Sequence, residues 1–371
     1  MNANAALRFK PSLMGFSVVE LMVAVTIGLV ILLATTTIFV QSKQTHTTQD
    51  SLARLQENGR FGMQFLMRDL RMGGYFGCAD DTTTVVNTLK GSTDGGAFDV
   101  SNPIQGSEAK SNWYPLIATP ATPPANMKAG TDAFALRYLD ASDAFAVLAP
   151  LAPDSSGALQ VSPGSALQQG DIVAAVDCGG SAIFQVTGAT SAGSLVHVAD
   201  QLDPGNFTAN LGGKIYELGS QVVKYHYASY YIADGASQQP ALFRDVLVLN
   251  PTTHTVSVQS QELVEGIENM QILYGEDMTG DRVPDRYVKA DAVANWRNVV
   301  AMRIGILARS LAQTDTKQVG QDLDTNTYDV DGDGTVDYWD LDSDGTVDTT
   351  PPNDRYQRRI FRTTVLMRNL Q

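Results

Sequence analysis

The pattern of apolar and polar residues sets the N-terminal stretch apart from the rest of the chain. No residue between Leu21 and Ser42 is charged, and the run LMVAVTIGLVILLATTTIFV is almost wholly apolar. About 20 helical residues at about 1.5 Å each span about 30 Å, which is the hydrocarbon thickness of a bilayer. We therefore expect residues 16–40 to form a transmembrane helix. Because Arg8 and Lys10 precede it without any acidic residue, the N-terminus should stay in the cytoplasm.

Beyond Gln41 the pattern becomes that of an amphipathic helix. Leucines and glycines recur at three- and four-residue steps, as one helical face requires: Leu52, Leu55, Gly59, Gly62, Leu66 and Leu70. No proline occurs between Phe16 and Met72, and Gly73-Gly74 provides a stop. The pattern predicts one helix, transmembrane over 16–40 and amphipathic over 41–74. The alternative is two helices, broken where β-branched threonines lower helix propensity, at Thr35–Thr37 or Thr45–Thr48.

The remainder of the chain, residues 75–371, has the pattern of a β-rich domain. Runs of β-branched and aromatic residues alternate with Gly, Ser, Pro and Asn, and Val300–Ile306 alternates as a half-buried strand does. The turn-rich stretches Asp80–Pro124 and Asp234–Pro240 are expected to be loops or insertions. The expected strands are Phe134–Tyr138, Ile172–Val176, Ala182–Val186, Leu195–Val198, Val222–Tyr231, Leu242–Leu249, Thr255–Gln259, Met270–Tyr274, Val299–Leu307 and Arg359–Met367. Together with the helix they predict an α+β fold.

Composition narrows the functions open to the chain. It has 371 residues, a formal net charge of −14 and 43% hydrophobic residues, so a sizeable core is possible. The acidic balance argues against nucleic acid as a main partner, because phosphate binding needs a basic surface. Two cysteines and four histidines leave little for a zinc site. We find no nucleophile elbow, phosphate-binding loop or zinc-protease motif and therefore expect no enzyme.

One acidic residue at the head of the apolar run calls for a functional explanation. A cleaved secretory signal or a simple signal anchor would account for the run itself, but neither accounts for Glu20, because an ionisable residue in a membrane segment is costly. The order Gly15-Phe16-Ser-Val-Val-Glu20 followed by the apolar helix resembles the type III signal of type IV pilins and pseudopilins. The resemblance implies that prepilin peptidase removes residues 1–15 as a leader and methylates Phe16. It also implies that Glu20 pairs with the N-terminal ammonium of a neighbouring subunit during assembly.

Later blocks of the chain are similar to PilW-type minor pilins. These blocks are Leu55–Cys78, Gly130–Ala141, Leu263–Val288 and Trp296–Ser310. The resemblance implies a single-pass inner-membrane precursor with a pilin-like periplasmic head, which later enters an extracellular pilus. It further implies priming of assembly, a place near the filament tip and, through the pilus, twitching motility and adhesion. The implied partners are other minor and major pilins, a tip adhesin, prepilin peptidase and the inner membrane.

Two other functions stay open at this point. A J-type pseudopilin of a type II secretion system would share the signal and a related pattern of late strands. A membrane-anchored periplasmic calcium-binding module would share the anchor, and it would tolerate the loss of Glu20.

The two cysteines both follow the transmembrane segment, in a compartment where disulfides persist. A bridge between Cys78 and Cys178 would close a loop of about 100 residues and contribute up to about 4.7 kcal/mol in the chain-entropy model. It would hold the end of the helix against the sheet. The alternative is a pair of buried free thiols.

An acidic loop over residues 322–348 carries the second candidate site. Between Lys317 and Arg355 there are eleven aspartates and no basic residue. Their spacing matches a calcium loop, with Gly334 at the turn position. The predicted ligands are Asp329, Asp331, Asp333, Thr335 (through its carbonyl), Asp337 and Asp340, and a second, incomplete unit adds Asp342, Asp344 and Asp348. Oxygen ligands without imidazole or thiolate favour Ca²⁺, whereas the alternative is a solvated acidic linker. A weaker third unit is Asp277–Asp285.

Overall fold

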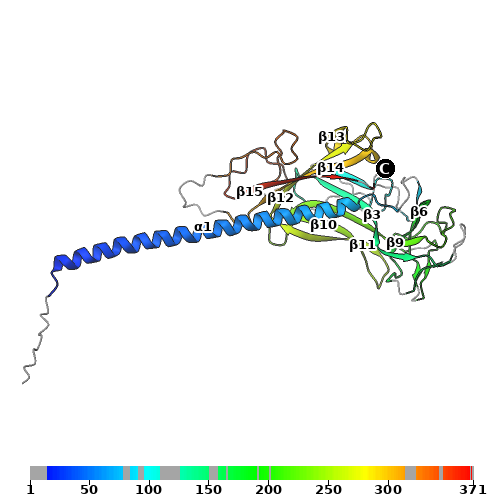
Figure 1. Cartoon of the computed structure of the whole chain (residues 1–371), viewed down its shortest axis with the longest axis horizontal. Coiled ribbons are helices and arrows are strands. Elements are labelled where there is room, and N and C mark those ends of the chain that lie inside the picture. The colour runs from blue at the N-terminus through cyan, green and yellow to red at the C-terminus, as the bar shows by residue number, and fades with distance from the viewer. Residues whose placement is uncertain are drawn as a thin grey trace, which may run out of the picture. The chain divides into compact units, whose positions relative to one another are not determined.

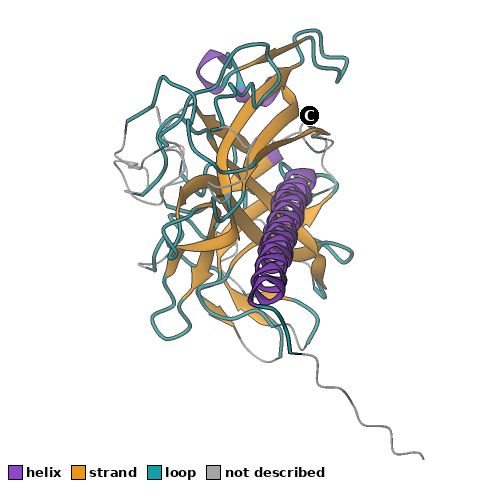
Figure 2. Cartoon of the chain, turned by 90° about the vertical axis from the view of Figure 1, so that its left-hand side faces the viewer, coloured by secondary structure: helices purple, strands orange, loops and turns teal. Residues whose placement is uncertain are grey.

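The computed structural model describes residues 15–77, 84–90, 96–108, 126–149, 158–163, 166–189, 192–199, 202–313, 323–341, 346–367 and 369 (Figure 1). The chain separates into two compact units, Met1–Ser51 and Leu52–Gln371. The boundary falls inside helix α1 (Val18–Met72). Figure 2 shows strands joined by loops throughout the second unit. The predicted helix and β-rich body are therefore both present, as an α+β fold requires.

Helix α1 passes through the threonine-rich stretches as one helix, so the alternative of two helices is wrong. The hydroxyls of Thr26, Thr35, Thr36 and Thr37 donate to carbonyls three or four residues earlier, at 2.7–3.0 Å. These bonds satisfy the hydroxyls within the helix itself. Because hydrocarbon offers no hydrogen-bond partner, they are what makes threonine tolerable in an apolar segment.

The second unit contains three sheets within its described residues. The largest runs in the order β1-β6-β5-β9-β10-β11, with β3 paired to β9 and β2 paired to β3. Its strands are β1 (Val85–Asn87), β2 (Ile104–Ser107), β3 (Ala133–Ala146), β5 (Ile172–Asp177), β6 (Gly180–Gln185), β9 (Gln221–Asp234), β10 (Pro240–Leu249) and β11 (Val256–Glu265). The second sheet runs β13 (Arg286–Val288), β12 (Ile267–Glu276), β14 (Val299–Arg309), β15 (Arg358–Leu366). The third is small: β4 (Leu159–Gln160), β8 (Ser194–Val196) and β7 (Gly188–Ala189).

All ten predicted strands have a counterpart, with different ends. The stretch Asp80–Pro124, predicted as loops or insertions, contains the strands β1 and β2 among its described residues. Both are too short to show alternation along the sequence. In contrast, Asp234–Pro240 is the turn between β9 and β10, as predicted.

The C-terminal part of α1 packs into the main core of the second unit. Its buried residues are Leu55, Gly59, Gly62, Met63, Leu66, Asp69 and Leu70. The apolar side chains among them share one cluster with side chains of both larger sheets, such as Tyr230 from β9 and Ile306 from β14. Leu52 was expected on this face, but it is 39% exposed. The helix ends where predicted, and Gly74 adopts φ +78°, which a residue without Cβ accepts readily.

Two glycines permit the close approach of α1 to the second sheet. A Cβ placed on Gly59 would lie 2.2 Å from the Phe361 ring of β15, and one on Gly62 would lie 3.3 Å from Ile306. These two glycines therefore lie on the buried face of the helix because they let its backbone approach the strands, and they add no apolar side chain to the core.

We predict that Gly59→Ala lowers the free energy of unfolding by about 1–2 kcal/mol, because overpacking against Phe361 outweighs the gain in helix propensity. Urea unfolding of the full chain in detergent measures this loss. The double variant Gly59→Ala/Phe361→Ala should be more stable than the sum of the single losses implies. Additive losses would show that the two residues are not coupled.

Candidate functional site

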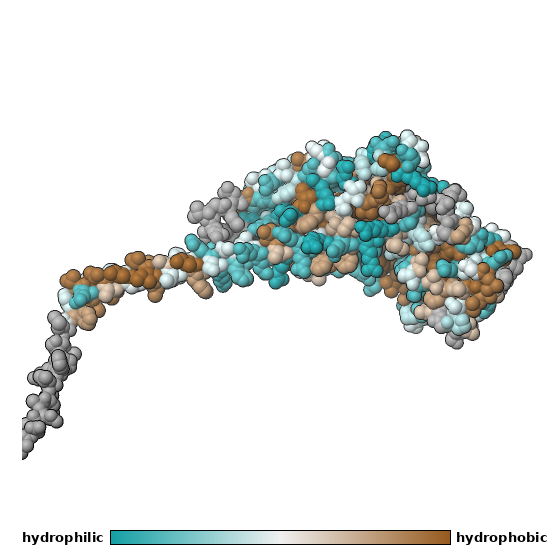
Figure 3. Space-filling model, in the orientation of Figure 1, coloured by the Kyte–Doolittle hydropathy of each residue, from teal (hydrophilic) through white to brown (hydrophobic). Residues whose placement is uncertain are grey.

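The predicted signal residues Gly15 and Phe16 come just before α1, which begins at Val18. Phe16 is 84% exposed, and Glu20 lies in the first helical turn, where the helix dipole favours a carboxylate. The large apolar side chains from Phe16 to Val40 are 46–84% exposed. Figure 3 shows them as a brown surface along this part of the helix. The helix is long and apolar enough to cross a membrane, which agrees with the predicted anchor.

The first unit of the acidic loop forms a tight turn around its own carboxylates. Asp329 accepts hydrogen bonds from the backbone N–H groups of Gly332 and Gly334, and Asp337 Oδ2 accepts one from Val330 at 2.6 Å. Gly332 and Gly334 adopt φ of +81° and +93°. Both glycines are therefore required by the backbone of the turn.

The turn brings together three of the predicted ligands. One carboxylate oxygen from each of Asp329, Asp331 and Asp333 lies within 4.8 Å of the other two. Asp337 and Asp340 are buried but fall outside this group, and Thr335 donates its hydroxyl to Asp333. Asp342 and Asp344 lie outside the described residues. The structure thus brings together three of the six ligands predicted for the first unit.

Burial and mutual repulsion raise the pKa values of two carboxylates in this turn, Asp331 and Asp337. The pKa of Asp337 is raised to about 6, chiefly by burial and also by the nearby charges of Asp331 and Asp333, against the hydrogen bond from Val330 and the charge of Lys289. Burial also raises the pKa of Asp331, and Asp333 and Asp329 add to the rise. The carboxylates are therefore held close together at an electrostatic cost.

Hydrogen bonds of this turn recur among the described residues of the other two predicted units. Leu341 N–H donates to Asp348, as Val330 N–H donates to Asp337. In the third unit Asp277 accepts from residues three and five positions later, and Asp285 accepts from Met278. However, Thr279 occupies the place of Asp331, and Arg282 (φ +66°) takes the place of Gly334. The third unit therefore shares the turn but lacks the central carboxylate.

The first acidic unit is packed against the second sheet. Val330 and Trp339 are buried with Leu307 of β14, and a Cβ on Gly305 would lie 1.8 Å from the Val330 carbonyl oxygen. Arg362 of β15 donates to the carbonyls of Asp329 and Val330. The strand β14 was predicted to be half-buried, but the acidic loop covers its second face.

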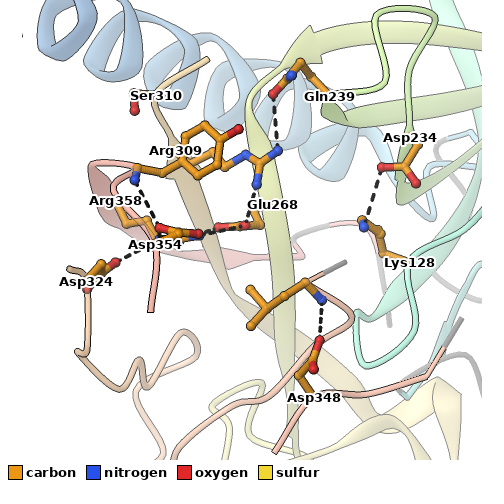
Figure 4. Close-up of polar contacts among 12 residues, drawn as sticks. Lys128, Asp234, Gln239, Glu268, Arg309, Ser310, Asp324, Asp348, Asp354 and Arg358 are labelled. Atoms are coloured by element: carbon orange, nitrogen blue, oxygen red, sulfur yellow. Dashed lines mark hydrogen bonds and ion pairs between the residues drawn. The ribbon is translucent and has the colours of Figure 1, made fainter. Parts of the chain in front are cut away.

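A buried ion network fixes the two ends of the acidic loop, and sequence reasoning missed it. The backbones of Asp324 and Asp354 pair in an isolated antiparallel β-bridge, and the Arg358 guanidinium binds both carboxylates at 2.7–2.9 Å. Arg358 also binds Glu268 of β12 at 2.6 and 3.1 Å, and Arg309 binds Glu268 at 3.0 Å. Figure 4 shows these side chains converging. The side chains of Arg358 and Glu268 are 0% and 1% exposed. Glu268, Arg309 and Arg358 lie just outside the ends of the predicted strands, and nothing in the residue pattern indicated that they would be buried.

The cysteines cannot both be placed. Cys78 lies outside the described residues, and Cys178 lies in the turn between β5 and β6. Gly77, the residue before Cys78, packs against Val176 of β5. The disulfide between Cys78 and Cys178 stays a prediction.

Residues 229–369 match the family model described as Type IV Pilus-assembly protein W. The match supports a type IV pilus-related protein. The matched range begins in β9 and takes in the second sheet, the acidic loop and the Arg358 network. No curated protein matches the chain.

We predict that Arg358→Met lowers the free energy of unfolding by about 3 kcal/mol or more, because Glu268 and Asp324 would keep buried charges with fewer partners. Thermal or urea unfolding measures the loss. Arg359→Met removes an exposed charge from the next residue and should have little effect. Adding Glu268→Gln to Arg358→Met should recover part of the loss. Equal stability of Arg358→Met and Arg359→Met would contradict this role for the network.

Proposed function

We propose that this chain is a PilW-type minor pilin that primes assembly of a type IV pilus and lies near the filament tip. The observation that carries the proposal is the match of residues 229–369 to a pilus-assembly family. The exposed apolar segment of α1, headed by Glu20, supports it. Type IV pilus function would then include twitching motility and adhesion.

The apolar segment of α1 suits two successive environments. Before assembly, the inner membrane would cover the side chains between Phe16 and Val40. In a filament, the corresponding helices of other pilins would cover them, so that the segment stays out of water in both states. The periplasmic head would then become the surface of an extracellular pilus.

Glu20 would set how far each helix is shifted along its neighbours when the subunit moves from the inner membrane into the filament. A carboxylate in hydrocarbon is tolerable only beside an opposite charge. Cleavage after Gly15 would create an ammonium on Phe16, and the Glu20 of one subunit would pair with the ammonium of another. Methylation of Phe16 by prepilin peptidase would leave a secondary amine that is still protonated near neutral pH. This role requires processing and packing, and it requires no catalysis by the chain.

The partners follow from the same role. The apolar helix would contact other minor and major pilins, and the β-rich, pilin-like head would dock a tip adhesin or cap the filament. The acidic surface, with a net charge of −14, gives no reason to assign nucleic acid to this subunit.

We predict that deletion of the gene removes surface pili and twitching, and that a Glu20→Ala copy fails to restore them. The matched control is Glu57→Ala, which removes an exposed carboxylate from the same helix outside the apolar segment. It should restore piliation to the wild-type level. Counting pili by electron microscopy and measuring twitching zones give the two readouts.

Two outcomes would contradict this proposal. Normal pili with a loss of exoprotein release would indicate a secretion pseudopilin. Full restoration by Glu20→Ala would indicate a membrane-anchored module whose anchor serves only for attachment.

A further inference from the structure

The acidic turn over Asp329–Asp337 has an unusual distribution of charge and exposure. Three carboxylates approach within 4.8 Å of one another at Asp329, Asp331 and Asp333. Like charges at this range repel unless a cation lies between them. A cluster of this kind is by itself common on protein surfaces, so a further observation has to decide whether a ligand belongs there.

Asp331 supplies that observation. The residue is 0% exposed, and its Oδ1 accepts a hydrogen bond from the Asp333 N–H at 2.9 Å. Its Oδ2 is buried and accepts no hydrogen bond from any residue that the structure describes. Buried polar atoms are almost always partnered, and an unpartnered charged oxygen is costly. A bound cation would supply the partner that Asp331 Oδ2 lacks.

Nearby basic groups do not take this place. The Lys289 ammonium lies 4.0 Å from Asp333, and the Arg362 guanidinium lies 3.5 Å from Asp329. Both side chains are more than a third exposed. They reduce the negative charge at the edge of the turn, but neither of these contacts reaches Asp331 Oδ2.

We infer that one Ca²⁺ binds at Asp329, Asp331 and Asp333 and thereby fixes the acidic loop on β14 and β15. Carboxylate oxygens are the ligands of a hard cation, and Ca²⁺ accepts six to eight oxygens in flexible geometry, whereas Mg²⁺ requires a near-ideal octahedron. The third unit, Asp277–Asp285, has the same turn with Thr279 in the central place, so it lacks the buried carboxylate that identifies the site.

The ion would act on the second sheet through the residues next to its ligands. Val330 lies between Asp329 and Asp331, and its carbonyl lies over Gly305 of β14 and accepts from Arg362 of β15 at 2.9 Å. The other face of β14 and β15 packs on α1 through Ile306 and Phe361. Ca²⁺ would thus rigidify the sheet that carries the helix. The inference does not depend on the role in pilus assembly.

Equilibrium dialysis of the detergent-solubilised full chain against millimolar Ca²⁺, after removal of metal with a chelator, tests the inference. We expect Asp331→Asn to bind one Ca²⁺ fewer per chain than the wild type. Asp143→Asn, which removes a carboxylate from an exposed stretch of β3, should bind the wild-type number. Replacing Ca²⁺ by Mg²⁺ at the same concentration should leave the site empty.

A second readout follows the loop itself. At a Ca²⁺ concentration ten times the dissociation constant, proteolysis within the loop should slow by about tenfold in the wild type. It should not slow in Asp331→Asn or in Asp333→Asn. Far-UV circular dichroism in chelator shows whether Asp331→Asn and Asp333→Asn have folded. If one of them has not, the binding and proteolysis of the other test the inference. Wild-type Ca²⁺ stoichiometry in a folded Asp331→Asn or Asp333→Asn, or no bound Ca²⁺ in the wild type, would overturn the inference.

Discussion

The close contact between α1 and the sheet β13-β12-β14-β15 organises the body of this protein. Gly59 and Gly62 leave room for Phe361 and Ile306, so the helix lies against the strands rather than one side chain away from them. The core around Leu66 and Leu70 then joins both larger sheets to the helix. The helix therefore has two apolar surfaces. Its C-terminal face is buried in the core, whereas its N-terminal segment is exposed and can be covered only by other apolar surfaces.

The opposite face of the same sheet carries the acidic loop. Residues of β14 alternate, so Ile306 faces the helix while Gly305 and Leu307 face Val330. Arg358 fixes both ends of the loop by binding Asp324, Asp354 and Glu268. A segment with the composition of a solvated linker is thereby built into the fold. The charges serve two separate purposes, because those at the ends are paired with arginine and those in the turn face one another.

The sequence predicted the periodic features of this structure and missed the long-range ones. A long run without charged residues identified the apolar helix, and the alternation of apolar and polar residues identified the longer strands, because both signals lie within short stretches of sequence. Short strands such as β2 contain too few residues to show alternation. Leu52 fits the helical spacing of the buried face, yet it is exposed. Its exposure depends on where along the helix the packing against the sheets begins, and the spacing of apolar residues does not show this. The turn at Asp329–Asp337 was predictable from spacing, since its hydrogen bonds are local. The Arg358–Glu268 pair was not, because its members lie 90 positions apart in the sequence and charged strand residues usually face solvent.

The proposed function requires this chain to enter a pilus as a processed subunit. Mass spectrometry of sheared surface filaments tests it most directly, through a search for the N-terminal peptide of the chain. We predict a peptide that begins at methylated Phe16, which would establish cleavage after Gly15 and incorporation into the filament together. An N-terminus at or near Met1 would contradict it.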